Sequence, residues 1–433
     1  MSSNGIITRQ ARRAGGLVLT LLAIELVDEL VDGAITAAWP AIRSDLALDY
    51  AQIGLLLTIP RLFGNLLEPP LALLGDAGDR RRIVIGGGVV FTLACVLTAT
   101  SWSFGALLVA FTVFNPASGA FVSLSQATLM DLEPHRHAQN MARWSLAGSL
   151  GVVGGAALIA LAARAGFGWR MVMAGIAGAA AALVLIVWRR RRAIPEGAAL
   201  EGARPERADE REPAADSGAH GEAHQGRLWA LARGAGHAIR ALRDGGVVRW
   251  LALLQASNLM LDVLHGFLAL YLVDVAGLSV GQAALAIASW TLVGLVGDVL
   301  LIPLLERVDG VRYLRVSAAL TAVGFGAFLL VPGFVPKLLI LGALGLLNSG
   351  WYAITKAGLY SAMPGRSATA LAIANVGDLA GAFIPLGIGL LASRVGLAPA
   401  MWVLLAGPLA LLVGLPAGTH GAIIANPSTE RPA

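Results

Sequence analysis

The chain is short of charge, of lysine and of cysteine. Charged residues make up 14% of its 433 residues, against about 25% in an ordinary soluble domain, and hydrophobic residues make up 57%. A soluble globule this apolar could not cover its surface with polar groups, so a soluble domain and a disordered chain are both excluded. The single cysteine, Cys95, cannot form an internal disulfide and argues against cysteine-based metal or redox chemistry.

No motif in the sequence points to an enzyme. A phosphate-binding Gly-Lys loop is missing, which argues against a reaction driven by ATP. His135 and His137 stand near Asp131 and Glu133, and we interpret this stretch as a solvated charged loop, with a metal site as the alternative. We therefore expect no catalytic residue, no cofactor and no resident metal.

Long apolar runs fill most of the sequence, whose mean hydropathy is +0.72. The runs are continuous rather than alternating, which indicates membrane helices and not the strands of a barrel. Charged, proline and glycine clusters separate them. We therefore expect an all-α integral membrane protein with twelve transmembrane helices, over residues 16–40, 51–74, 83–100, 104–130, 138–162, 169–188, 247–273, 281–305, 313–331, 337–362, 368–393 and 400–415.

A charged segment divides the chain between the sixth and seventh runs. Residues 189–249 hold 21 of the 59 charged residues. The expected organisation is an N-terminal six-helix half over 1–188, a cytoplasmic linker over 189–246 and a C-terminal six-helix half over 247–433. Within the linker, 193–225 is predicted to be disordered. Apolar residues near helical spacing over 226–244, with arginines around them, predict an amphipathic helix on the bilayer surface, or else more of the same disordered linker.

Arginine and lysine are distributed unevenly between the two sides of the predicted membrane. If the N-terminus is cytoplasmic, cytoplasmic segments carry 25 of these residues and the other side carries 5, or 13 against 5 without the long linker. The positive-inside rule therefore predicts a multi-pass plasma-membrane protein with both termini in the cytoplasm. The net charge of +5 then reflects topology and contact with bilayer lipids. We expect a monomer that binds no nucleic acid.

Four acids interrupt the first apolar run. Glu25, Asp28, Glu29 and Asp32 fall at i, i+3, i+4 and i+7 and share one face of a helix. A charged side chain that faced lipid would cost roughly several kcal/mol of free energy, so the stripe must face protein or water. Four adjacent carboxylates cannot all be ionised cheaply, which predicts groups that exchange protons. The alternative is that they only pair with basic residues of the bundle.

The seventh run carries a second polar face. Gln255, Asn258, Asp262 and His265 follow one another at i, i+3, i+7 and i+10. Asp262 and His265 are one turn apart, so they are predicted to share a proton, with a structural histidine as the alternative.

Other polar residues also fall within apolar runs, and we add four of them to the candidate cavity: Arg61, Gln126, Lys356 and Asp378. Lys356 would be a counter-ion to Asp262 or Asp378, or a contact for an anionic group.

The two halves repeat at one constant offset along the chain, without a gap. The matches include Gln52 with Gln282, Glu68 with Asp298, Asp79 with Asp309 and Arg82 with Arg312. Two six-helix halves joined by a long linker are typical of transporters built from parallel repeats. We assign Glu68 and Asp298 structural or gating positions.

The loop between the second and third runs resembles a known motif. It reads Gly75-Asp76-Ala77-Gly78-Asp79-Arg80-Arg81-Arg82 and is similar to the G-x-x-x-D-R-x-G-R-R loop of the major facilitator superfamily, with Ala77 at a usual arginine and Asp79 at a usual glycine. The resemblance implies that family's fold, with helices one, four, seven and ten around a central cavity. It also implies a cytoplasmic gating role for Asp76, Asp79, Arg80, Arg81, Arg82 and for their second-half counterparts Glu306, Arg307 and Asp309.

Together these features predict a secondary active transporter that works by rocking alternating access. Coupling to protons is assigned to the stripe of acids and to Asp262, and the acidic cavity favours export of a small cationic or polar molecule. Alternatives are a divalent-metal exporter with carboxylates, Asn258 and His265 as ligands, a proton-coupled importer of a sugar or organic anion held by Lys356, and a receptor or lipid-binding scaffold without transport. Sodium in place of protons also fits the acids.

Overall fold

The computed structural model describes residues 3–74, 80–132, 136–191, 194, 243–363 and 367–416, and these form helices joined by short turns. Four predictions lie wholly or partly outside the described residues: the disordered linker, most of the amphipathic helix, the loop acids Asp76 and Asp79, and the charged loop with Glu133 and His135.

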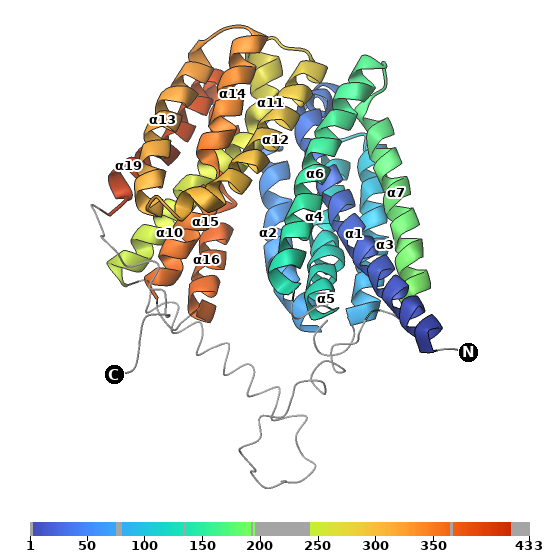
Figure 1. Cartoon of the computed structure of the whole chain (residues 1–433). Coiled ribbons are helices and arrows are strands. Elements are labelled where there is room, and N and C mark those ends of the chain that lie inside the picture. The colour runs from blue at the N-terminus through green and yellow to red at the C-terminus, as the bar shows by residue number, and fades with distance from the viewer. Residues whose placement is uncertain are drawn as a thin grey trace, which may run out of the picture.

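The N-terminal half is drawn in blue and green in Figure 1. Its helices are α1 (Ser3–Leu46), α2 (Tyr50–Leu74), α3 (Arg80–Thr100), α4 (Phe104–Ser118), the π-helical turn η2 (Gly119–Ser123), α5 (Leu124–Leu132), α6 (His137–Arg164) and α7 (Trp169–Arg190).

The C-terminal half lies beside it, drawn from yellow to red. Its helices are α10 (Gly245–Asn258), the π-helical turn η5 (Leu259–Val263), α11 (Leu264–Leu270), the π-helical turn η6 (Tyr271–Val275), α12 (Val280–Leu305), α13 (Gly310–Leu330), α14 (Phe334–Asn348), α15 (Trp351–Ser361), α16 (Ser367–Gly381), α17 (Ile384–Val395), α18 (Leu397–Met401), the 3-10 turn η7 (Trp402–Leu405) and α19 (Ala406–Gly414).

The repeat expected from the sequence is present in the helix boundaries. The offset that relates the two halves in sequence carries the bounds of α3 onto those of α13, and the bounds of α4 onto those of α14. Even the helix caps repeat: Asp49 and Gln52 exchange backbone-to-side-chain hydrogen bonds of 2.7 and 3.0 Å at the start of α2. Ser279 and Gln282 do the same at the start of α12, at 3.2 and 3.0 Å. Such reciprocal caps satisfy amides that the first helical turn leaves unpaired.

Ten helices of the described chain are long and apolar enough to cross a membrane. The two remaining predicted spans correspond to α1 and α2, which are 44 and 25 residues long. Four acids lower the hydropathy of α1, and Arg61 and Glu68 lower that of α2. An integral membrane protein of helical type is therefore confirmed, whereas the count of twelve spans stays a prediction.

Hydropathy did not predict the interruptions within the spans. The fourth and seventh spans contain the π-helical turns η2, η5 and η6, and the tenth breaks between Asn348 and Trp351, where Gly350 has a φ of +71°. A π-turn changes the backbone hydrogen bonding of a helix but not its residue composition, so a hydropathy profile does not detect it. Such turns are frequent at functional sites.

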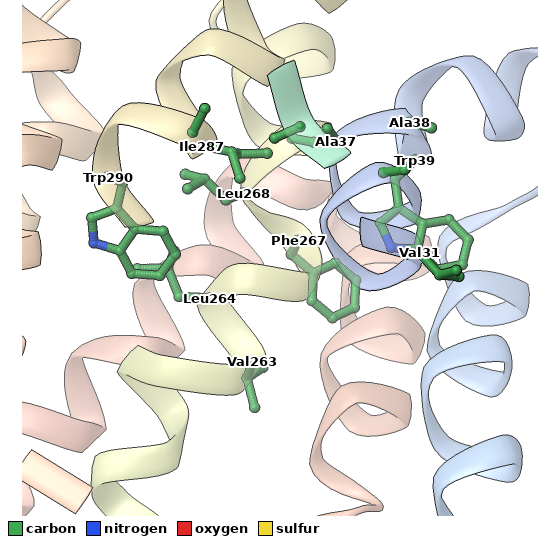
Figure 2. Packing of buried hydrophobic residues seen from close by; sticks show 14 of the residues in the cluster. Val31, Ala37, Ala38, Trp39, Val263, Leu264, Phe267, Leu268, Ile287 and Trp290 are labelled. Carbon is green, nitrogen blue, oxygen red and sulfur yellow. The ribbon is translucent and has the colours of Figure 1, made fainter. Parts of the chain in front are cut away.

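The two halves meet at the end of the molecule away from the C-terminus of α7 and the start of α10, and they diverge toward the end that holds these two (Figure 1). Glycines allow the closest approach: a Cβ on Gly54 of α2 would lie 2.9 Å from the Pro385 carbonyl oxygen of α17. Nearer the centre, buried side chains of α1, α11 and α12 pack together, with Phe267 and Trp39 among the largest (Figure 2). We call the end where the halves meet the contact end, and the end where they diverge the open end.

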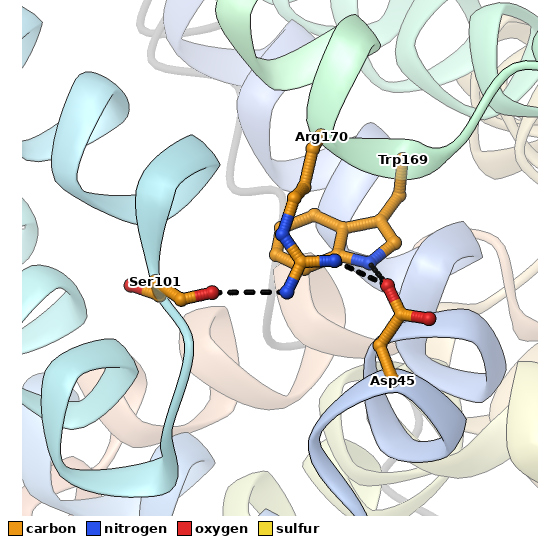
Figure 3. A network of polar contacts seen from close by, with 4 residues as sticks. All are labelled: Asp45, Ser101, Trp169 and Arg170. Atoms are coloured by element: carbon orange, nitrogen blue, oxygen red, sulfur yellow. Dashed lines mark hydrogen bonds and ion pairs between the residues drawn. The ribbon is translucent and has the colours of Figure 1, made fainter.

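The N-terminal half is tied together at the contact end by Asp45, the last acid of α1. Its carboxylate accepts a hydrogen bond of 2.8 Å from the Trp169 indole and pairs with Arg170. Arg170 in turn donates to the backbone oxygen of Ser101 at 3.0 Å, after α3 (Figure 3). One carboxylate thus connects the ends of three helices, through Trp169 and Arg170.

Candidate functional site

A cavity of about 690 Å³ lies between the two halves. The N-terminal half contributes Glu29 and Asp32 of α1 to its lining, and the C-terminal half contributes Asp262, His265 and Asp298. Further lining comes from apolar and aromatic residues of α12 and from the break in the tenth span. Acids from both halves therefore face one shared cavity.

An ion pair beside this cavity joins one half to the other. Nη2 of Arg61, on α2, lies 2.6 Å from Oδ2 of Asp262, in η5. The two side chains are 42% and 41% exposed, so water reaches both partners. The charges of Asp378 and Asp32 also act on the guanidinium. The pairing partner of Arg61, which no sequence pattern indicated, is thus an acid of the opposite half.

The four acids of α1 divide between three environments. Glu25 is buried, interacts with the Trp144 indole and lies against Gly148 of α6. Asp28 faces α4 and accepts a hydrogen bond of 2.8 Å from Ser118.

Glu29 and Asp32 line the main cavity. The predicted stripe does face protein and water, but only its last two members reach the space between the halves.

A second, more polar cavity of about 380 Å³ adjoins the first. Its lining includes Arg61, Asn258, Asp262 and Asp378, four of the predicted site residues. Gln255 positions Asp378 from the side, since its amide nitrogen donates to Oδ1 of Asp378 at 3.0 Å.

His265 lies near Asp262 along the chain but makes a different contact. Its ring meets Trp290 edge to face, with centroids 5.6 Å apart, and its buried Nε2 has no hydrogen-bond partner among the described residues. Asp262 instead bonds to Arg61. The proton sharing expected between His265 and Asp262 therefore has no hydrogen bond to support it in this conformation.

Two predicted site residues lie away from these cavities. Gln126, on α5, donates to the Sδ of Met141 at 3.7 Å. Lys356, on α15, donates to the Tyr352 hydroxyl at 2.6 Å and its ammonium lies 4.7 Å from the ring centroid. Of the two expected counter-ion partners of Lys356, Asp262 is taken by Arg61.

The arginines of the loop motif hold neighbouring helices together at the open end. Buried Arg80 pairs with Asp131 at the end of α5, and Arg81 donates to the backbone oxygen of Ile194 at 3.1 Å. Asp131 was not assigned this role from the sequence, because an acid at a helix end has many possible partners.

In the second half Asp309 caps α13 by accepting from the amide of Arg312 at 3.0 Å. Glu306 and Arg307 follow the end of α12 directly.

At the contact end, a network that the sequence did not reveal joins the halves. Oδ2 of Asp274, in η6, pairs with Arg43 of α1 at 3.1 Å and accepts from the Tyr50 hydroxyl of α2 at 3.0 Å. The Arg43 guanidinium also lies over the Tyr50 ring, 4.5 Å from its centroid. These residues stand at the ends of predicted spans, where polar side chains are expected in any membrane protein.

Two pseudo-symmetric helical halves around a charged cavity define the class of membrane transporters built from repeats. The sequence profile of the Major Facilitator Superfamily matches residues 21–385. The chain therefore belongs to the major facilitator superfamily, whose members are transporters.

Solved structures share this fold at low sequence identity. The inward-facing, unoccupied form of a bacterial homologue of the human lysosomal transporter Spinster matches with a TM-score of 0.68 and 17% identity, over 93% of this chain and 95% of that one. The nucleoside transporter NupG matches with a TM-score of 0.71 and 11% identity, over 92% and 98%. At these identities the likeness shows the fold alone.

Curated relatives match over shorter stretches. The fosmidomycin resistance protein of Escherichia coli K12 is 27% identical over 177 residues, which are 39% of this chain and 43% of that protein. A probable sugar efflux transporter of Mannheimia succiniciproducens is 30% identical over 152 residues, 34% and 38% of the two chains. The matched stretches thus span less than half the length of these relatives.

Proposed function

We propose that the protein is a proton-coupled exporter of a small cationic or polar molecule. The observation that carries the proposal is the 2.6 Å ion pair between Arg61 and Asp262, at the polar cavity that adjoins the main one. Because each half supplies one partner, the rocking of the halves changes the geometry of the pair. A proton on Asp262 removes its charge and frees Arg61 to turn toward Asp32 or Asp378. Proton binding and the position of the halves are then coupled.

The strength of the pair suits this role. Its side chains are 42% and 41% exposed, and solvent-screened pairs contribute about 1 kcal/mol or less. Coupling free energies between sites are typically about 1–3 kcal/mol, so a proton or a substrate group is sufficient to displace Arg61. A fully buried pair would be too costly to break in each cycle.

The charge of the main cavity favours the substrate class. Glu29, Asp32, Asp262 and Asp298 line it, and no arginine or lysine of the described chain does. Such a lining attracts cations and hydrogen-bond donors and disfavours anions. The words "resistance" and "efflux" in the names of the curated relatives support export as the direction.

The distribution of arginine supports a cytoplasmic open end, since Arg80–Arg82 and Arg189–Arg191 lie there. In the observed arrangement the cavity would then take its substrate from the cytoplasm. Water and protons reach Asp262 from the same side.

The alternatives have less support. Among the described residues there is no group of three or more His, Cys, Asp or Glu side chains able to hold a metal ion, which a divalent-metal exporter would need. An importer of anions relied on Lys356, which donates to Tyr352 and lines none of the cavities described above.

Proteoliposomes with a pH-sensitive dye inside test the proposal. Ethidium serves as a cationic probe and methyl glucoside as a neutral polar one, and at least one should drive proton flux in the wild-type protein. Asp262→Asn and Asp32→Asn should fold normally and lose the pH dependence of transport. Asp49→Asn is the matched control, because asparagine caps α2 as aspartate does. Wild-type pH dependence in both cavity variants would contradict proton coupling through these acids.

A further inference from the structure

The break in the tenth span forms one wall of the main cavity. α14 ends at Asn348 and α15 begins at Trp351, with Gly350 in the left-handed conformation between them. The consecutive residues 348–353 all line the cavity of about 690 Å³. Because α15 starts there, the amides of its first turn have no carbonyl partner within the helix and are available as donors.

The equivalent position of the first half is built differently. In the register of the repeat Ser118 and Gly119 match Asn348 and Ser349, but there the chain continues as the helical turn η2. Glu68, which matches Asp298, accepts from Ser123 and packs against Gly119. Neither Glu68 nor Ser118 lines a cavity described above. The break and its opening to the cavity therefore belong to the C-terminal half alone.

Asp298 supplies acceptors at this break. Its Oδ1 accepts from the Gly350 amide at 3.1 Å, while Oδ2 makes no hydrogen bond to any described residue.

Asn348 supplies a donor. The residue is 3% exposed, and its Oδ1 accepts from the Thr321 hydroxyl at 3.1 Å. Its buried Nδ2 has no partner among the described residues. A buried donor left unpaired costs free energy that a ligand acceptor would recover.

Two tryptophans complete the wall. Trp351 is fixed by a hydrogen bond of 2.9 Å from its indole to Ser317, and Trp290 meets His265 edge to face. Both line the cavity. Rigid aromatic surfaces beside polar groups are typical of small-molecule sites.

We propose that this break is the substrate subsite and that it takes a neutral, hydroxyl-bearing molecule. A hydroxyl donates to Asp298 and accepts from Asn348 or the first amides of α15, so it satisfies both kinds of group at once. A cation would satisfy the carboxylate but leave the donors facing positive charge. An anion would meet the donors but be repelled by Asp298. The inference rests on the proposed function and selects its polar substrate over its cationic one.

Equilibrium binding to the purified protein tests the subsite without a proton gradient. The neutral probes are methyl glucoside, maltose, myo-inositol and ribitol, and the charged probes are tetraethylammonium and gluconate. At least one neutral polyol should bind, with quenching of tryptophan fluorescence and an affinity at least tenfold higher than that of either charged probe. Tighter binding of tetraethylammonium, or binding of no neutral polyol, would overturn the inference.

Variants locate the binding in the break. Asp298→Asn keeps the acceptor for Gly350, and Asn348→Asp keeps the size of the side chain while replacing its donor by an acceptor. Each should weaken polyol binding about 10- to 100-fold. Glu68→Gln, at the equivalent position of the other half, should leave the affinity unchanged. Unchanged affinity in both subsite variants, with melting temperatures that show folded protein, would overturn the assignment.

The outcomes separate this inference from the proposed function. Proton-coupled export of a cation without polyol binding would overturn the subsite chemistry and leave the exporter standing. Polyol binding that depends on Asp298 and Asn348, without coupled proton flux, would overturn the proton-coupled exporter and leave the subsite standing.

Discussion

Arg61 is the residue on which the charge balance of the cavities depends. Among the described arginines and lysines it is the one that lines them. The charges of Asp262, Asp378 and Asp32 act on it together. Because one cation faces three acids, carboxylates that Arg61 does not pair with are available to accept a proton or a substrate at each stage of the cycle.

Arg61→Gln should therefore abolish coupled transport while leaving the fold almost as stable as before. The pair is solvent-screened, so its loss should lower the free energy of unfolding by about 1 kcal/mol or less. Transport in proteoliposomes and thermal unfolding of the purified variant measure the two effects. Normal transport in the variant, or a loss of stability of several kcal/mol, would contradict a screened and functional pair.

Close helix packing is the main structural device at the scale of elements. In the first half, Gly33 of α1 and Gly155 of α6 bring two backbones into contact, since a Cβ on Gly155 would clash with the Leu30 carbonyl oxygen. Its neighbour Gly154 differs, because a Cβ there would meet only the flexible end of Leu30 at 3.1 Å. Small residues at such positions permit tight helix pairs in membranes.

Gly155→Ala should destabilise the N-terminal half, whereas Gly154→Ala should have little effect. Backbone atoms cannot move aside as a side chain does, so we expect a loss of about 1–3 kcal/mol for the first change. Thermal unfolding in detergent compares the two variants directly. Equal melting temperatures for both would show that the α1–α6 contact is looser than described.

The contact end is held by an element of the seventh span. η6 carries Asp274, which binds Arg43 and Tyr50 of the other half. Opening at this end requires that these bonds break, while the bond of Asp45 to Trp169 stays within one half.

Asp274→Asn should shift the protein toward the arrangement that is open at this end. Spin labels on exposed Phe167 and Val335 in a Cys95→Ser background, read by pulsed electron resonance, report the separation of the halves there. We expect a larger population of long distances than in the wild type. Asp45→Asn serves as the control and should not change the distribution; the same shift in both variants would contradict a specific latch.

At the scale of the whole molecule, the sequence predicted the two halves but not the site's geometry. The constant offset between the halves reappears in helix bounds and caps, because the apolar periodicity and capping residues that set them are local features. The α1 acids lie against α4, against α6 and at the main cavity. Their division among three environments depends on α4 and α6, which a single helix pattern does not contain.

Neither the partner of Arg61 nor the break at Gly350 could be predicted from the sequence. Arg61 and Asp262 are separated by 201 residues in sequence, and several acids would have served as well. Gly350 stands in an apolar run whose hydropathy is that of an ordinary span. Long-range pairing and backbone conformation arise from packing, so only the structure reveals them.

The most direct test is the separation of the halves at the open end with and without the charge of Asp262. Spin labels on Met141 and Ser361 measure this distance in the wild type and in Asp262→Asn, with no need for a known substrate. Loss of the charge should release Arg61 and favour the arrangement closed at this end, so short distances should be more frequent in the variant than in the wild type. Equal distributions in the two proteins, or longer distances in the variant, would contradict coupling through the Arg61–Asp262 pair.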